Sequence, residues 1–311
     1  MTDSDQQVFQ EITILPDPNA RRRLAALVGI DEVKDRLTKE TRLLLEPAAL
    51  EDWSKKHHGD VLPIVKMFFD RPPLFIFAGD VGTGKTALAE TFGDALARNL
   101  NLSITLYSLS LNTRGTGVVG QMTTLLSAAF ASVKEEAKKG LVKGKRPTKG
   151  VIFLIDEADA LAQSREFSQM HHEDRAGVNA LIRGIDTLAA ERLPAVVIMC
   201  TNRMDALDPA VRRRAAEIFQ FERPNELQRA RVLRDGLTGS ALTDEQFAML
   251  ANATGPTADR EYGCTYSDLT QRLLPKFILD AFPDQPLGFE RLLSISVSFT
   301  PTAPFKERAP S

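Results

Sequence analysis

The stretch GDVGTGKT, residues 79–86, fits the pattern G-x-x-x-x-G-K-T of a loop that binds phosphates. Its glycines let backbone amides turn inward around β- and γ-phosphates, while Lys85 supplies a point charge and Thr86 offers a hydroxyl to Mg²⁺. The apolar run LFIFAG (74–79) precedes the loop and the helix-like run ALAETFGDALARN (87–99) follows it. This strand–loop–helix context favours a phosphate site over the alternative, a chance glycine-rich turn.

Further apolar runs are predicted to be strands. Beside residues 74–79 they are SITLYSLS (103–110), VIFLID (151–156), AVVIMCTN (195–202) and EIFQF (217–221). Nearly continuous apolar runs are typical of strands that are covered on both faces of a parallel sheet. Because these runs alternate with helix-like segments, the sequence predicts an α/β fold with a parallel, doubly wound sheet.

The strand signal stops after ERPN (222–225), and helical stretches follow. They are NELQRARVLRDGL (225–237), TDEQFAMLANATG (243–255), which begins with a threonine cap, and YSDLTQRLLPKFILDAF (266–282), which Pro275 is expected to kink. We therefore expect an extended or partly disordered polar arm at 1–23, a large α/β domain at 24–222, a small helical domain at 223–300 and a disordered tail at 301–311.

Composition excludes several classes of protein. The net charge of −2 over 311 residues gives no global field that favours nucleic acid or an anionic membrane. No apolar run approaches the roughly 18–20 residues of a membrane helix. Cys200 and Cys264 are the two cysteines, and their spacing fits neither a metal site nor a disulfide framework. This usage fits a reducing cytosol, so we expect a cytoplasmic protein.

An acidic pair completes the candidate site. In VIFLIDE, Asp156 ends a predicted buried strand, where its carboxylate can hold Mg²⁺ through water, and Glu157 is placed to polarise an attacking water. Asn202 ends a strand that should lie beside this one, so its amide can help to orient the water. The alternatives are a polar strand cap for the acidic pair and a turn-forming role for Asn202.

The order of motifs resembles the AAA+ ATPases over about residues 24–285. The motifs are LVGIDEVKDRL (27–37), GDVGTGKT, LIDEADAL (154–161), CTNR (200–203) and LDPAVRRR (207–214), followed by a helical lid. Within that superfamily, DRAGVNALIRGID (174–186) is similar to the remodellers of HORMA-domain proteins, the thyroid-receptor-interactor and pachytene-checkpoint family, which has bacterial relatives in anti-phage operons.

This resemblance implies an ATP- and Mg²⁺-dependent homo-hexamer that pulls on a HORMA-domain client. It implies catalytic roles for Glu157, Asn202 and an arginine finger, Arg213 or Arg214, that reaches a neighbouring subunit's γ-phosphate; the alternative for the arginine run is a solvated face. It implies Mg²⁺ ligation by Thr86 and Asp156. The implied nucleotide contacts are Val28, Gly29, Asp80, Val81, Gly82, Thr83, Gly84, Lys85 and Thr86.

A second glycine-rich loop, RGTGVVGQM (114–122), also takes its interpretation from the resemblance. In related unfoldases the loop at this place faces the central pore and grips an extended polypeptide. Val118 and Val119 would then stand at its tip, although an aromatic residue is usual there. The alternative is a structural loop with Val118 packed in the core.

The chain departs from the family in its lid and at its start. Ser267, Asp268 and Leu269 stand where Gly-Arg or Gly-Ala is usual. Arg272, one turn later, is the nearest basic residue, so its contact with the γ-phosphate stays open. Only about 23 residues precede the ATPase core, so client recognition must use that arm, the pore face or another subunit.

Two other functions compete with protein remodelling. KKGLVKGKRPTKG (138–150) is basic and could bind DNA in a helicase-loader-like ATPase, but it lacks the interleaved aromatic residues that stack on bases. A solvated insertion is the favoured interpretation, and nucleic acid is not an expected partner. The other alternative is an ATP switch that does not translocate. The histidine pairs at 57–58 and 171–172 lack a carboxylate at helical spacing and are not expected to bind metal.

Overall fold

The computed structural model describes residues 8–111, 121–141, 146–161 and 171–305. These form two compact units. The first takes the described parts of Met1–Ala26, Glu32–Ala78 and Thr86–Gln220, and the second takes those of Leu27–Asp31, Gly79–Lys85 and Phe221–Ser311. The glycine-rich loop after residue 78 therefore belongs with the carboxyl-terminal helices, although the strand before it and the helix after it belong to the first unit.

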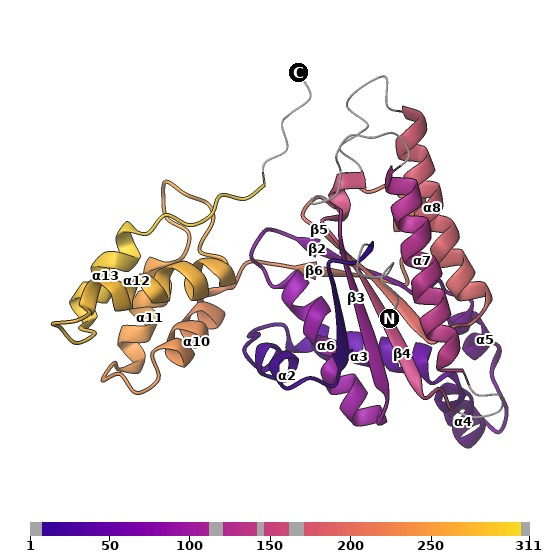
Figure 1. The fold of residues 1–311 in the computed structure, drawn as a ribbon. Coiled ribbons are helices and arrows are strands. Elements are labelled where there is room, and N and C mark those ends of the chain that lie inside the picture. Colours follow the sequence, from indigo (N-terminus) through magenta and orange to yellow (C-terminus); the bar gives the residue numbers. More distant parts are fainter. Residues whose placement is uncertain (1–7, 112–120, 142–145, 162–170, 306–311) are drawn as a thin grey trace. The chain divides into compact units, whose positions relative to one another are not determined.

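The first unit is built on a six-stranded sheet of order β1-β3-β4-β5-β2-β6 (Figure 1). β3, β4, β5 and β2 pair in parallel along this order, which confirms the predicted α/β class. The strands are β1 (Glu11–Leu15), β2 (Leu74–Gly79), β3 (Ser103–Ser110), β4 (Lys149–Asp156), β5 (Ala195–Thr201) and β6 (Glu217–Phe221). The middle strands are buried along almost their whole length, because helices cover both faces of the sheet.

The polar amino-terminal segment is more ordered than the sequence predicts. β1 pairs antiparallel with β3 at the edge of the sheet, and α2 (Pro18–Ala25) follows it. Asp17 caps this helix by accepting a hydrogen bond from the Ala20 amide. The Asp17 amide in turn donates to Asp94 Oδ1 on α6 at 2.7 Å, and Asp94 is only 1% exposed. An edge strand needs one partner only, so a short run of mixed polarity suffices.

The helices of the first unit pack around the sheet. α7 and α8 lie side by side (Figure 1), and a Cβ at Gly184 would come within 2.3 Å of the Phe130 ring, so the glycine allows their close approach. The Phe130 ring meets Phe153 of β4 edge to face. The helices are α3 (Asp31–Leu45), α4 (Pro47–His58), α5 (Pro63–Phe69), α6 (Lys85–Leu100), α7 (Gln121–Lys139), the 3₁₀ turn η1 (Ala158–Leu161), α8 (His171–Ala190) and α9 (Pro209–Arg212).

The second unit contains the helices expected after residue 222. Asn225 and Thr243 each form a capping box at the start of a helix, which agrees with the start signals read from the sequence. Pro275 lies in the first turn of a helix that a π-helical turn precedes, and this turn accommodates the missing amide of the proline. The elements are α10 (Glu226–Gly236), α11 (Asp244–Ala253), the π-helical η3 (Asp268–Leu273), α12 (Leu274–Ala281) and α13 (Phe289–Ser298).

The start of the predicted disordered tail is fixed in the structure. Pro301 is buried, and the amide and hydroxyl of Thr302 both donate hydrogen bonds to the buried carboxylate of Asp268, at 3.0 and 2.7 Å. The tail prediction is therefore wrong for these two residues, because long-range hydrogen bonds compensate for their polar composition. No helix in the described ranges combines the length and apolar character needed to cross a membrane.

Candidate active site

The carboxyl ends of three neighbouring strands meet at one edge of the sheet. In the register, Ile155 of β4 lies opposite Met199 of β5, and Ala78 of β2 lies opposite Thr201. Ligands of open α/β sheets bind outside this edge. β4 ends at Asp156, β5 is followed directly by Asn202, and β2 ends at Gly79, where the glycine-rich loop begins. This order of strand and residue is the one that the sequence predicts.

The two predicted Mg²⁺ ligands lie together. The hydroxyl of Thr86, at the start of α6, donates to Asp156 Oδ2 at 2.9 Å across 70 residues of sequence. A hydroxyl and a carboxylate are the hard oxygen ligands that Mg²⁺ prefers, so the pair fits the ion. Within the described part of the chain, no group of three or more His, Cys, Asp or Glu residues could hold a metal alone.

Glu157 is held by a residue that the sequence reasoning missed. Its Oε2 accepts a hydrogen bond from Ser110 Oγ at 2.8 Å, and Ser110 ends β3, beside β4. The backbone of Glu157 adopts φ of 55°, a left-handed conformation that costs an L-residue roughly 1–2 kcal/mol. The Glu157 backbone amide donates to Asp156 Oδ1 at 2.8 Å, which orients the Asp156 carboxylate. Strain of this kind concentrates at functional sites.

The turn after β5 is fixed by a buried acid. Asp159 of η1 accepts hydrogen bonds from the Thr201 hydroxyl at 3.3 Å and from the Asn202 amide N–H at 3.4 Å. These contacts use the backbone of Asn202 and leave its side-chain amide for another partner. The position beside β4 that was predicted for Asn202 is therefore present.

The glycine-rich loop forms a compact turn in the second unit. Lys85 Nζ donates to the carbonyl oxygens of Gly79 and Asp80 at 2.9 and 2.7 Å, and the Thr83 hydroxyl donates to the same Asp80 oxygen. Gly82 has φ of 75°, and Gly84, on the other side of Thr83, has φ of 98°, so this turn needs glycine at both places. The role of this loop in binding phosphates stays a prediction.

The segment around Val28 and Gly29 packs against the helices of the second unit. Gly29 O accepts a hydrogen bond from Gln228 Nε2 at 3.0 Å, and a Cβ at Gly29 would lie 2.6 Å from the Tyr266 hydroxyl. Val28 is part of the apolar core of this unit. Burial, and then the charge of Asp31, raise the pKa of Tyr266 to about 12, so the phenol stays neutral. Sequence reasoning missed Gln228 and Tyr266, which carry no motif.

The arginine run follows α9, and its members differ. Arg214 pairs with Asp186 of α8 through Nε and Nη2, at 2.9 and 3.1 Å, and this hydrogen bonding raises the pKa of Arg214. Arg213 bonds only the Pro209 carbonyl among the described residues, through Nε. Of the two predicted fingers, Arg213 therefore has the more available guanidinium.

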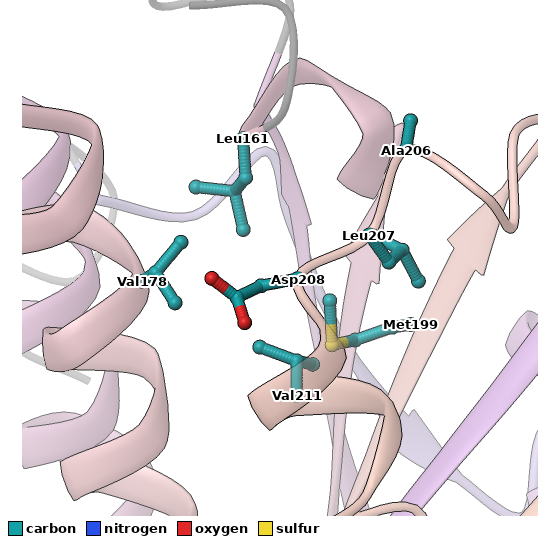
Figure 2. Close-up of a pocket in the computed structure, with 7 residues that line it drawn as sticks. All are labelled: Leu161, Val178, Met199, Ala206, Leu207, Asp208 and Val211. Atoms are coloured by element: carbon teal, nitrogen blue, oxygen red, sulfur yellow. The ribbon is translucent and has the colours of Figure 1, made fainter. Parts of the chain in front are cut away.

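The seat of α9 is apolar. Figure 2 shows the side chains of Leu161, Val178, Met199 and Val211 around a small cavity, with the carboxylate of Asp208 among them. Its volume, about 10 Å³, is room for about one water molecule. A larger cavity of about 280 Å³ lies at the amino ends of β2 and β5, which is the opposite end of the strands from the one where ligands bind. The first cavity is too small for a nucleotide and the second lies at the wrong end of the sheet, so neither cavity is a nucleotide site.

Arg272 lies within a network of its own unit. Its Nη1 donates to Asp268 Oδ1 at 2.6 Å and to the Thr302 hydroxyl at 3.2 Å, and its guanidinium stands 4.9 Å from the centre of the Phe299 ring. These contacts give it a structural place in the helical unit. Val118 and Val119 lie outside the described residues.

A loop of the pattern G-x-x-x-x-G-K-T, and a threonine after it that contacts the aspartate at the end of a parallel strand, are typical of nucleoside triphosphatases. Residues 75–223 match the family described as "ATPase family associated with various cellular activities (AAA)". CD-NTase-associated protein 6 of Escherichia coli strain MS 115-1 is 52% identical over 302 residues, which cover 97% of this chain and 97% of that protein.

Two solved structures extend the comparison. A chain of the E. coli MS115-1 HORMA:CdnC:Trip13 complex gives a TM-score of 0.90 at 51% identity, covering 98% of this chain and 100% of that one. Rhizobiales Trip13 gives 0.74 at 47% identity, covering 95% and 100%. The chain therefore belongs to the AAA ATPases and, within them, to the family of CD-NTase-associated protein 6. It is an ATP-hydrolysing enzyme, and the predicted resemblance is confirmed.

Proposed function

We propose that the protein is an ATP-driven homo-hexameric ring that remodels or partly unfolds a HORMA-domain protein by pulling a segment through its pore. The proposal places this activity in the control of anti-phage signalling in the bacterial cytoplasm. The observation that carries it is the similarity, over 98% of the chain, to a chain solved in complex with HORMA and CdnC proteins. Cys200 and Cys264 are buried and form no disulfide, which fits a reducing compartment.

Each site residue has a role in this proposal. Lys85 and the amides of the loop bind the phosphates of ATP, and Thr86 with Asp156 holds Mg²⁺, which neutralises charge on the phosphates. Glu157, oriented by Ser110, takes a proton from the attacking water, and the Asn202 amide orients that water.

The ring is proposed from the resemblance to the AAA+ ATPases, in which an arginine of one subunit reaches the γ-phosphate held by its neighbour. An arginine that stabilises the transferring phosphoryl group must come from a neighbour, and Arg213 is the better candidate because Arg214 is paired with Asp186. Val118 and Val119 are proposed to line the pore.

A DNA-associated ATPase is less well supported. In the basic stretch 138–150, Lys139 and Lys149 pair with Glu136, and Lys138 pairs with Glu191. These acids offset part of the positive field that phosphate binding needs, and Lys143 and Lys145 lie outside the described residues. A switch that only binds ATP would make Glu157 dispensable, and its strained backbone and its bond to Ser110 favour a catalytic role instead.

The test is affinity capture with the Glu157→Gln protein in the presence of ATP, and Lys85→Ala as the matched control. The trapped ring should retain a HORMA-domain protein, and the Lys85→Ala protein should release it because it binds no ATP. Equal recovery of the client with both variants, or none with Glu157→Gln while ATP is bound, would contradict the proposal.

A further inference from the structure

An ion pair joins the phosphate loop to the start of the helical unit. Nε and Nη2 of Arg223 both donate to Asp80 Oδ2, at 2.7 and 2.5 Å. The two side chains are 14% and 17% exposed, so water screens the pair little. Asp80 follows the first glycine of the loop, and Arg223 comes two residues after β6.

The rest of the Arg223 guanidinium is also engaged. Nη1 donates to Gly263 O at 2.7 Å, Nη2 donates to Thr302 O at 2.8 Å, and the Tyr262 ring lies 4.9 Å from the guanidinium carbon. A planar guanidinium with several partners is fixed in orientation, which a lysine in its place could not reproduce. Arg223 therefore connects the loop to two other segments of the same unit.

The second of these segments is held by a buried acid. Asp268, 1% exposed, accepts from the amide and hydroxyl of Thr302 and from Arg272 Nη1. Burial raises the pKa of Asp268, but the hydrogen bonds from Thr265, Thr302 and Arg272 lower it by a larger amount. The net shift of this pKa is therefore downward, and the carboxylate stays charged. The Thr302 carbonyl is thus in a fixed place to accept from Arg223.

Asp80 is in direct contact with Lys85, the lysine of the loop. Its carbonyl oxygen accepts from Lys85 Nζ at 2.7 Å, and its Oδ1 accepts from the Val81 amide at 2.8 Å. The Asp80 carboxylate is thus part of the loop that is expected to bind the negatively charged phosphates of the nucleotide. Without a cation beside it, this carboxylate would repel the phosphates and compete for Lys85.

We propose that Arg223 is a positioning residue of the nucleotide site. It neutralises the charge of Asp80 and fastens the phosphate loop to Gly263 and Thr302, so that the loop keeps its conformation and Asp80 does not repel the phosphates. The proposal rests on the nucleotide role of this loop and is independent of the client.

The experiment is a double-mutant cycle on the affinity for fluorescently labelled ADP with Mg²⁺. Arg223→Gln should raise Kd about tenfold, because one negative charge is left unpaired near the phosphates. Asp80→Asn removes the negative charge and keeps a hydrogen-bond acceptor, so it should bind more tightly than Arg223→Gln. The double variant should return to within about threefold of the wild type, and the Arg223→Gln penalty should shrink at high salt.

A matched control is available on the same unit. Asp280 and Arg291 form a second ion pair with two contacts, at 2.6 and 2.7 Å, between α12 and α13. Asp280→Asn and Arg291→Gln should leave Kd unchanged. Melting curves for all variants identify any that lose their fold.

Three results would overturn the proposal. They are wild-type affinity in a folded Arg223→Gln protein, a double variant as weak as that single one, or at least tenfold weaker binding by Asp80→Asn. The third result, on Asp80→Asn, can be measured even where the Arg223→Gln protein does not fold. Normal labelled-ADP binding with no client remodelling would instead contradict the proposed function and leave this inference standing.

Discussion

Glu157→Gln should separate ATP binding from hydrolysis. The replacement keeps the shape of the side chain and an oxygen that can accept from Ser110 Oγ, at 2.8 Å in the wild type. A hydrogen bond to a charged acceptor contributes about 1.5–3 kcal/mol and one to a neutral acceptor about 0.5–1.5, so the substitution should cost about 1 kcal/mol. That corresponds to a fall in Tm of at most about 2–4 °C.

The effect on turnover should be much larger. Loss of a positioned general base lowers the rate roughly 10²- to 10⁴-fold, while the affinity for ATP should stay within about twofold. Phosphate release, binding of labelled ATP and thermal melting on one preparation measure the three quantities together. A variant with more than about a tenth of wild-type kcat, or one that loses ATP binding in proportion to kcat, would refute the assignment of Glu157 as the base.

Three further variants test the other roles. Lys85→Ala should abolish nucleotide binding, measured by calorimetry, because the phosphates lose their principal cation. Arg213→Ala should keep ATP binding but cut turnover on the order of 10³-fold, more than Arg214→Ala does, and mixing it with Lys85→Ala protein should restore some activity through intact shared sites; mixed rings without activity would count against a shared interface. Val118→Gly should keep most ATPase activity and lose client processing, whereas early melting with lost ATPase activity would place Val118 in the core.

Much of the fold could be predicted because buried parallel strands appear in the sequence as nearly continuous apolar runs. The five predicted strands appear with bounds that differ by at most two residues, since each is a compact run in a chain of mixed polarity. The loop Gly79–Thr86 and the pair Asp156 and Glu157 could be recognised because phosphate and Mg²⁺ chemistry restricts both residue type and spacing.

What the sequence did not reveal depends on partners that are distant along the chain. β1 is stabilised by β3 and by the bond from Asp17 to Asp94, 77 residues away. No motif marks Ser110 as a site residue, and only the pairing of β3 with β4 brings it beside Glu157. Thr302 belongs to a segment of disorder-like composition, and hydrogen bonds with Arg223, Asp268 and Arg272 give it a fixed place. Local propensity contains no information on such contacts.

The proposed ring should use ATP hydrolysis to change the conformation of a HORMA-domain protein. Hydrogen exchange of the HORMA-domain protein from the same bacterium should be followed with ATP and catalytic amounts of the enzyme, and with Glu157→Gln enzyme as the control. The account predicts that wild-type enzyme exposes amides of the client that stay protected with the Glu157→Gln enzyme. Unchanged protection of the client, while the wild-type enzyme hydrolyses ATP in the same tube, would contradict it.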